Sequence, residues 1–335
     1  MTKALVTGAT GFIGYHVAKV LEKKGIAVRA LVREGSELSA FAAIDAEQVR
    51  GDLRDYGAVL RAERGCDKVY HVGADYRLWV RDPQTMYDVN VKGTVNVMRG
   101  ALEAGVSKVV YTSTVGVLSQ EKNGKPGNEA TVARIEDMTG HYKRSKFLAE
   151  KEVLGFVEKG LNAVIVNPTA PIGAMDRKPT PTGKIIVDFL NGRMPAYLDT
   201  GLNFVDVEDV AEAHVSASES GVTGERYILG NANLTLKQFL GILAGLTGRE
   251  PPRWRLPYWP VLCLARLSEG LSKVTRTRPA IPVDGVRMAR HYMFFDCSKA
   301  VRDLGMAQNS VEMAARKAIE WYIGKGYVKR PLSGG

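Results

Sequence analysis

The chain has 335 residues, 45% hydrophobic and 24% charged, which is typical of a globular protein with one large domain and a smaller one. Its net charge of +10 is spread without a polybasic run, so it favours anionic small molecules or an acidic membrane surface over nucleic acid. Three widely spaced cysteines argue against a metal or disulfide framework, and with no signal peptide or membrane-length apolar run the sequence predicts a cytoplasmic protein.

The first predicted strand, Ala4–Val6, runs into a glycine-rich turn that reads TGATGFIG. Gly8, Gly11 and Gly14 open the next predicted helix, with Phe12 and Ile13 between the last two glycines. Backbone without Cβ atoms can approach a diphosphate closely, and the N-terminus of a helix attracts its negative charge. We therefore predict that these five residues bind a dinucleotide.

The second predicted strand, Val28–Val32, ends at Arg33 rather than at an acidic residue. An acidic residue at this position usually binds the ribose 2′-hydroxyl of NAD, whereas a cation suits the 2′-phosphate of NADP. The sequence thus favours NADP over NAD, and Arg33 as a solvated strand end is the alternative. Asp52 and Leu53 follow another strand, where they are expected to contact the adenine.

Further apolar runs alternate with helical patterns, as in a Rossmann-type, doubly wound α/β fold with a parallel sheet. Residues 1–170 are predicted to form the dinucleotide-binding domain, to which later segments return, and residues 171–330 a smaller mixed α/β substrate region. The remaining elements expected are strands at 69–72, 109–111, 163–166 and 227–229, and helices at 15–24, 87–104, from 209 and at 236–246.

A group of hydroxyl and amine side chains follows the strand at 109–111. Thr112 and Thr114 end the strand, and Tyr142 and Lys146 lie one turn apart on a later helix, in the stretch GHYKRSKFLAEK. A tyrosine with a free pKa of about 10 needs a nearby cation to act as a base at neutral pH. We predict that Lys146 lowers the Tyr142 pKa and holds the cofactor's ribose, that Tyr142 is the acid or base, and that Thr114 holds the substrate oxygen.

The segment 254–267, WRLPYWPVLCLARL, is apolar, aromatic and interrupted by proline. We expect a packed loop and helix here. A substrate entrance or a membrane-surface contact is the alternative.

The motifs TGATGFIG, GDL, HVGAD, NVKGT, YTST, YKRSK and FVDVEDVAEAHV together resemble the extended short-chain dehydrogenase/reductases, across nearly the whole chain. The resemblance implies that Val72, Gly73 and Ala74 line the nicotinamide ribose and that Pro168 and Thr169 border the carboxamide. It also implies that Thr112 contributes to the cofactor site and that Asn90 supports it. A homodimer through the helices that start near Tyr87 and His141 is a further implication.

Within that family, ADYRLWVRDP and VDGVRMARHYMFF are most similar to hopanoid-associated sugar epimerases, and VRALVRE with YTST is similar to dihydroflavonol 4-reductases. Nucleotide-sugar epimerases commonly place an arginine before the FVDV strand, where this chain has Leu202 and Asn203; Arg193, Arg287 or Arg290 are the candidates to replace it. We therefore expect an NADP-dependent reductase or dehydrogenase acting on a carbonyl or alcohol, with a sugar epimerase as the alternative. A non-catalytic cofactor sensor would usually lack the Tyr/Lys pair.

Overall fold

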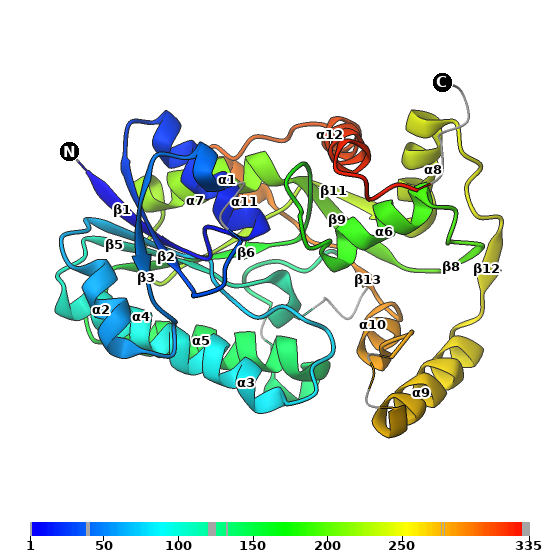
Figure 1. The fold of residues 1–335 in the computed structure, drawn as a ribbon, viewed down its shortest axis with the longest axis horizontal. Coiled ribbons are helices and arrows are strands. Elements are labelled where there is room, and N and C mark those ends of the chain that lie inside the picture. Colours follow the sequence, from blue (N-terminus) through cyan, green and yellow to red (C-terminus); the bar gives the residue numbers. More distant parts are fainter. Residues whose placement is uncertain are drawn as a thin grey trace.

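The computed structural model describes residues 2–37, 41–119, 125–131, 133–275, 277 and 279–329. Its centre is a seven-stranded parallel sheet with the strand order β10-β6-β5-β4-β1-β2-β3 (Figure 1). The strands are β1 Lys3–Thr7, β2 Ala27–Val32, β3 Ala46–Arg50, β4 Lys68–His71, β5 Lys108–Thr112, β6 Ala163–Pro168 and β10 Arg226–Leu229. The order reverses at β1, which confirms the predicted doubly wound fold and puts a crevice at the carboxyl ends of the strands.

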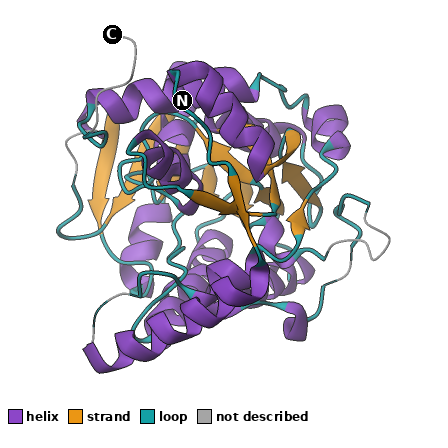
Figure 2. Ribbon diagram, turned by 90° about the vertical axis from the view of Figure 1, so that its right-hand side faces the viewer, coloured by secondary structure: helices purple, strands orange, loops and turns teal. Residues whose placement is uncertain are grey.

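Helices cover both faces of this sheet, as the side view in Figure 2 shows. One face carries α1 Phe12–Lys23, α7 Val207–Ser220 and α11 Ser298–Leu304. The other carries α2 Tyr56–Glu63, α4 Gly93–Glu103 and α5 Gly140–Glu158. A short helix, α3 Pro83–Tyr87, continues through a π-helical turn at Asp88–Lys92 into α4.

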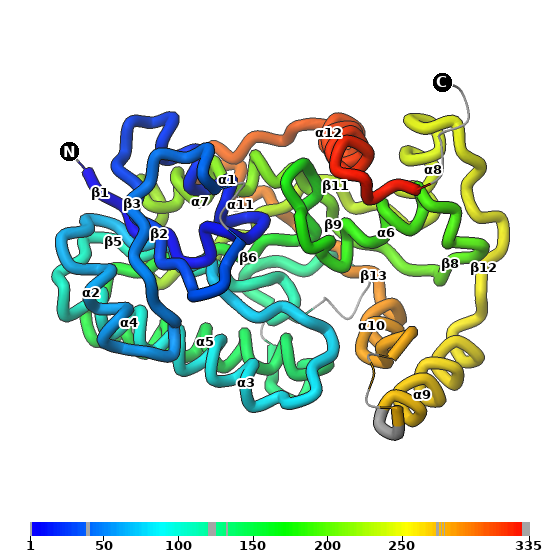
Figure 3. Tube along the Cα trace, viewed as in Figure 1, coloured from blue at the N-terminus to red at the C-terminus, as the bar shows by residue number. Residues whose placement is uncertain are grey.

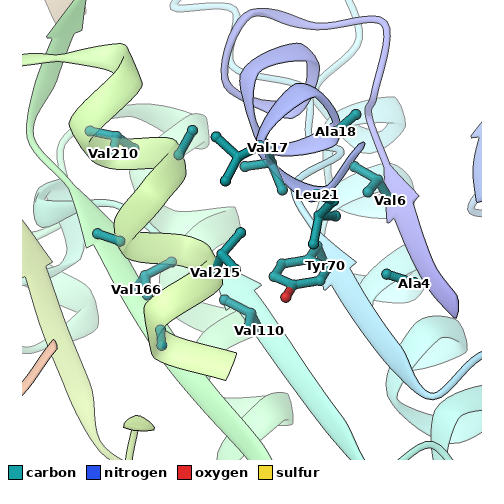
Figure 4. Packing of buried hydrophobic residues seen from close by; sticks show 14 of the residues in the cluster. Ala4, Val6, Val17, Ala18, Leu21, Tyr70, Val110, Val166, Val210 and Val215 are labelled. Carbon is teal, nitrogen blue, oxygen red and sulfur yellow. The ribbon is translucent and has the colours of Figure 1, made fainter. Parts of the chain in front are cut away.

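The sheet is buried on both faces, which explains why its strands read as apolar runs. All six residues of β6 are buried. On one face, Val17 and Leu21 of α1 pack toward Val210 and Val215 of α7, with Tyr70 of β4 beneath them (Figure 4). Burying one such aliphatic side chain stabilises the fold by about 1.5–3 kcal/mol.

A second group of elements lies beyond the carboxyl edge of the large sheet. It holds a four-stranded sheet, in which β9 pairs with three other strands, and a separate parallel pair, β8 and β12. The strands are β7 Ala170–Ile172, β8 Ala196–Leu198, β9 Gly201–Asp206, β11 Ala232–Thr235, β12 Trp254–Leu256 and β13 Tyr292–Met293. The helices are α6 Pro181–Leu190, α8 Leu236–Thr247, α9 Tyr258–Thr275, α10 Val283–Met288 and α12 Val311–Gly324.

Late segments of the chain return to the first sheet. Strand β10 pairs with β6, and α7 packs beside α1, so segments far apart in the sequence lie together (Figure 3). The division into 1–170 and 171–330 stays a prediction, because the chain passes between the two groups of elements more than once. The tail 331–335, expected to fray, lies outside the described residues.

Candidate active site

The glycine-rich turn joins β1 to α1 at the point where the strand order reverses. Gly8 has φ +70°, and a Cβ on it would lie 2.6 Å from the Cα of Gly73. A Cβ on Gly14 would lie 2.2 Å from the carbonyl oxygen of Gly8. The N-terminus of α1 begins at Gly11 with no side chain capping it, so its first N–H groups are available to an anion. This geometry fits a dinucleotide diphosphate.

A cavity of about 1570 Å³ extends from this turn along the carboxyl edge of the sheet. It is lined by every residue predicted to bind cofactor or to act in catalysis except Asn90. These residues are Gly8, Gly11, Phe12, Ile13, Gly14, Arg33, Asp52, Leu53, Val72, Gly73, Ala74, Thr112, Thr114, Tyr142, Lys146, Pro168 and Thr169. The fold therefore brings together positions that span more than 160 residues of sequence.

At the β2 end of the cavity, Arg33 is exposed directly after the strand. Asp52 forms a two-point ion pair with Arg54, whose Nε lies 2.9 Å from Oδ1, and this partner holds the pKa of Asp52 below its usual value. Leu53 is buried, with its Cδ1 3.2 Å from where a Gly73 Cβ would be. Arg33 thus adds a cation to a rim that also carries Glu34 and Glu37, beside the apolar side chain of Leu53. An arginine beside an apolar surface suits a phosphorylated adenosine.

At the other end, α5 places Tyr142 and Lys146 beside the end of β5. Lys146 is 2% exposed; its Nζ donates to the carbonyl oxygen of Thr112 at 2.7 Å and lies 4.3 Å from the centre of the Tyr111 ring. Burial lowers the pKa of Lys146 to about 7. Lys146 is therefore a desolvated amine beneath the cavity, and its charged form is stabilised by one carbonyl oxygen and one aromatic ring.

Tyr142 is enclosed by protein but open to the cavity. Burial raises its pKa to about 12, and a hydrogen bond with Thr114 opposes that rise. Desolvation of the phenol is the largest cause of this rise. Tyr142 is consequently protonated at neutral pH and is placed to donate a proton. The expectation that Lys146 lowers the pKa of Tyr142, together with an oxidised nicotinamide, stays a prediction.

Asn90 lies in the π-helical turn, behind the cavity wall. Its Nδ2 donates to the carbonyl oxygen of Asp75 at 2.8 Å and to Oγ of Ser145 at 2.9 Å, while its Oδ1 accepts from the Asp75 N–H at 2.7 Å. It therefore ties the loop after β4 to α5. Asn90 does not line the cavity, so its position is that of a supporting amide rather than of a residue in contact with the cofactor.

Two buried histidines, which the sequence did not single out, fix the strand ends. His71 bonds Thr7 Oγ1 at 2.8 Å and Thr94 Oγ1 at 3.0 Å, and Thr7 Oγ1 accepts from the Gly73 N–H at 3.1 Å. His214 bonds Thr112 Oγ1 at 3.0 Å. Burial lowers their pKa values to about 3 and about 4, so both rings are neutral and structural at pH 7.

Arg177 is a second residue that sequence reasoning missed. Its Nη2 donates to the carbonyl oxygen of Thr10 in the glycine-rich turn at 2.7 Å, and it lines the cavity. Its Nη1 is buried without a hydrogen-bond partner among the described residues. The loop that carries it turns at Met175, which has φ +70°. A guanidinium beside this turn can pair with the diphosphate of a dinucleotide.

The positions compared with sugar epimerases give a different result. Asn203 is buried in β9, where its Nδ2 donates to Asn233 Oδ1 at 2.9 Å. None of the proposed replacements, Arg193, Arg287 and Arg290, lines the cavity. Among the described residues, no arginine at positions 193, 202, 203, 287 or 290 lines the cavity, where it could bind a sugar diphosphate.

The segment 254–267 forms the expected helix, but it is packed on one side only: Leu262 and Ala265 are buried, and the other side is exposed. Trp254 is 72% and Leu267 71% exposed, and neither lines the cavity. The sequence could not decide this, because α9 is apolar on both of its faces. Among the described residues, no helix is long and apolar enough to cross a membrane.

Comparison with known proteins identifies relatives along the whole chain. The NAD dependent epimerase/dehydratase family matches residues 4–230. A dihydroflavonol 4-reductase candidate from Synechocystis sp. is 41% identical over 97% of this chain and 95% of its own length. Sterol demethylase protein B of Methylococcus capsulatus is 33% identical over 97% of this chain and 99% of its own length.

Solved structures give the same fold. The crystal structure of gox2253 is 43% identical, with a TM-score of 0.87, and the match covers 98% of this chain and 99% of that one. A nucleoside-diphosphate-sugar epimerase from Pseudomonas aeruginosa has a TM-score of 0.80 with the same coverage but only 24% identity, which shows a common fold alone.

Proposed function

Because the chain belongs to the NAD dependent epimerase/dehydratase family, we propose that it is an NADP(H)-dependent oxidoreductase that reduces a carbonyl, or oxidises the matching alcohol, in its main cavity. One observation carries this proposal: a single cavity has an anion-binding glycine turn at one end and Tyr142, Thr114 and Lys146 at the other. Along one sheet edge, that arrangement supports a cofactor site next to a proton donor.

A bound nicotinamide would supply or accept the hydride. In the reductive direction, Thr114 holds the substrate oxygen and Tyr142 donates its proton to that oxygen as the alcohol forms. A pKa of about 12 keeps Tyr142 protonated and ready for this step. In the oxidative direction Tyr142 must first lose its proton, which requires the charge of Lys146 and of the oxidised cofactor.

We propose NADP rather than NAD because Arg33 lines the cavity directly after β2, and a cation there can bind a 2′-phosphate. NADPH should then raise the melting temperature more than NADH, and Arg33→Gln should remove most of that difference. The exposed Arg50→Gln, just before the cavity-lining Gly51, is the matched control. Equal shifts by the two cofactors in the unmodified protein would refute the assignment.

An epimerase of a free, nucleotide-linked or hopanoid-associated lipid-linked sugar is the alternative. It would use the same Tyr142, Thr114 and Lys146 but return the hydride to its substrate. Relatives at 33–41% identity carry reductase or demethylase names, whereas the epimerase structure is 24% identical. These names support the reductase.

Turnover distinguishes the two functions. The protein should oxidise NADPH in the presence of apolar aldehydes or ketones, and the corresponding alcohol should accumulate in equal amount. Conversion of UDP-glucose to its 4-epimer without net change in the cofactor would overturn the proposal. A homodimer through α4 and α5 and a cytoplasmic location are further parts of the proposal, and sedimentation of the purified protein tests the first.

A further inference from the structure

Helix α9 has two apolar faces, and only one is covered. Leu262 and Ala265 are buried against Val283 and Val286 of α10. On the opposite side, exposed positions recur at helical spacing. They are Pro260, Leu264, Leu267 and Leu271. Apolar residues spaced three or four apart form one stripe along a helix, so the exposed set is continuous.

The strand before the helix extends this surface. Trp254 and Leu256 of β12 are exposed, and Trp259 in the first turn of α9 is 63% exposed. Two of the chain's four tryptophans lie here. We call Trp254, Leu256, Trp259, Leu264, Leu267 and Leu271 the α9 surface. It lies at one end of the molecule, where β12 runs into α9 (Figure 1).

The same segment concentrates the positive charge of the chain. Residues 249–290 hold nine basic and three acidic residues, so they supply six of the ten net positive charges in 42 residues of 335. Arg266 is exposed elsewhere on the same helix, and the Arg290 guanidinium lies 5.8 Å and 5.9 Å from the ring centres of Tyr258 and Trp259. An apolar surface flanked by cations is complementary to anionic lipid headgroups over an acyl layer.

We propose that the α9 surface docks this protein on an anionic lipid bilayer, with α9 lying in the plane of the interface. The leucines enter the acyl boundary, and the tryptophan rings occupy the headgroup level, where their apolar bodies and polar N–H groups are both accommodated. The helix lies on the membrane rather than across it, since Arg266 and Glu269 interrupt its apolar run and no described helix meets the requirement for a span.

The positive charge of the segment argues against a second copy of the chain as the partner that covers the α9 surface. A two-fold symmetric contact would place the same patch against itself, which would bring two copies of a segment with an excess of basic residues together. Like charges facing each other oppose association, whereas an anionic bilayer gains from every lysine or arginine near it.

The α9 surface is one helix away from the active site. Helix α10 packs on α9 and also contacts the start of α5, where a Cβ on Gly140 would lie 2.4 Å from Oδ2 of Asp284. A Cβ on Gly285 would lie 4.0 Å from Leu78, a residue that lines the main cavity. Docking would therefore hold the substrate side of the cavity near the bilayer. The docking itself does not depend on the proposed reaction.

Vesicle sedimentation tests the proposal with the full chain. Vesicles of phosphatidylcholine mixed with phosphatidylglycerol should bind the protein, and binding should weaken with added salt and on vesicles of phosphatidylcholine alone. Leu264→Asp with Leu267→Asp should reduce the partition coefficient about tenfold or more. The matched control is Val222→Asp with Met313→Asp, at positions 59% and 50% exposed on other faces, and it should bind as the unmodified protein does.

Cys263 provides a second measurement. It is exposed on α9 between Leu262 and Leu264, while Cys66 and Cys297 are buried, so a thiol-reactive, polarity-sensitive dye will label it alone. The dye's emission should shift to shorter wavelength when the anionic vesicles are added, and the shift should be absent with the double aspartate variant. Melting temperature and the NADPH-induced shift confirm that each variant is folded.

Absence of sedimentation and of an emission shift with folded, unmodified protein would overturn the proposal. Equal binding by the α9 double variant and the control pair would also overturn it, because it would place the lipid contact elsewhere. A dimer that dissociates in the α9 variant, together with no vesicle binding, would assign the surface to a second copy instead.

Discussion

Two regions of this molecule, the cavity beside Lys146 and the outer face of α9, differ in which side chains they leave in water. Beside the cavity, Lys146 is a cation withdrawn from water, held by one carbonyl oxygen and one aromatic ring. At α9, large apolar side chains are left in water while others on the same helix are covered. Each arrangement costs the isolated chain stability. The comparison teaches that both sites are arranged for a component outside the chain.

The largest effect is expected at the proton donor. Tyr142→Phe removes the proton that the reaction needs, so kcat should fall by about 10²–10⁴-fold while the cofactor-induced rise in melting temperature is unchanged. Tyr56→Phe, on the outer face of α2, is the matched control and should keep full activity. Retained turnover in Tyr142→Phe would show that Tyr142 is not the proton donor, and the end of the cavity beside Lys146 would then have no assigned role in the reaction.

Lys146→Met tests whether the buried cation is there for function rather than stability. Steady-state turnover should fall by about 100-fold, since the charge near Tyr142 is lost. Burial lowers the pKa of Lys146 to about 7 from 10.5, so between these values the unfolded chain binds more protons and stability rises with pH. The variant should therefore be more stable at pH 6 by roughly 1–3 kcal/mol, a gain that shrinks toward pH 10.

That gain is measured by urea unfolding without cofactor at the two pH values. A variant that is less stable than the unmodified protein at pH 6 would show that Lys146 stabilises the fold. The claim that the buried amine costs the chain stability would then be wrong.

Glu63 is a buried carboxyl outside the cavity, and it sharpens the comparison. Its carboxyl is fully buried between α2 and α4 without a hydrogen-bond partner among the described residues, and burial raises its pKa from 4.5 to about 9. The folded state therefore binds more protons between these values, so stability falls as pH rises from about 4.5 to 9. Glu63→Gln should stabilise the protein by about 1–3 kcal/mol at pH 8 and by less at pH 5.

Urea unfolding at both pH values measures this, with Glu158→Gln at an exposed carboxylate as the control. A pH-independent difference between Glu63→Gln and the unmodified protein would contradict the assignment.

The smallest effect is expected at α9. Leu267→Ser should change the free energy of unfolding by no more than about 0.5 kcal/mol, because the side chain is already in water. Leu262→Ser, on the covered face of the same helix, should cost about 2–4 kcal/mol. Thermal denaturation of the pair measures the difference, and similar losses in the two variants would mean that the outer face is also packed.

The sequence predicted what depends on local pattern. The strands of the sheet were identifiable because parallel strands are apolar throughout, and the glycine turn because its geometry excludes side chains. Arg177 could not be found this way, since its approach to Thr10 depends on how a loop turns at Met175. The exposure of α9 was equally hidden, because Leu262 and Leu264 differ in environment and not in type.

The pKa of Tyr142 illustrates the same limit. Spacing along a helix correctly indicated that Tyr142 and Lys146 share a side, but the pKa depends on how much water the fold removes around each group. Asn90 is similar: its motif was recognisable, and its hydrogen bonds to Asp75 and Ser145 are long-range.

The late arrival of β10 in the large sheet has a consequence for synthesis on the ribosome. The edge of β6 stays unpaired until Arg226–Leu229 has emerged. The face of the sheet that carries α1 also needs α7, which emerges before β10, and α11, which emerges about 70 residues after it, before it is covered. Unpaired strand edges and uncovered apolar faces are sites where nascent chains aggregate or recruit chaperones. A fragment ending near residue 170 would present both indefinitely, so the cofactor-binding half is expected to need the rest of the chain to remain in solution.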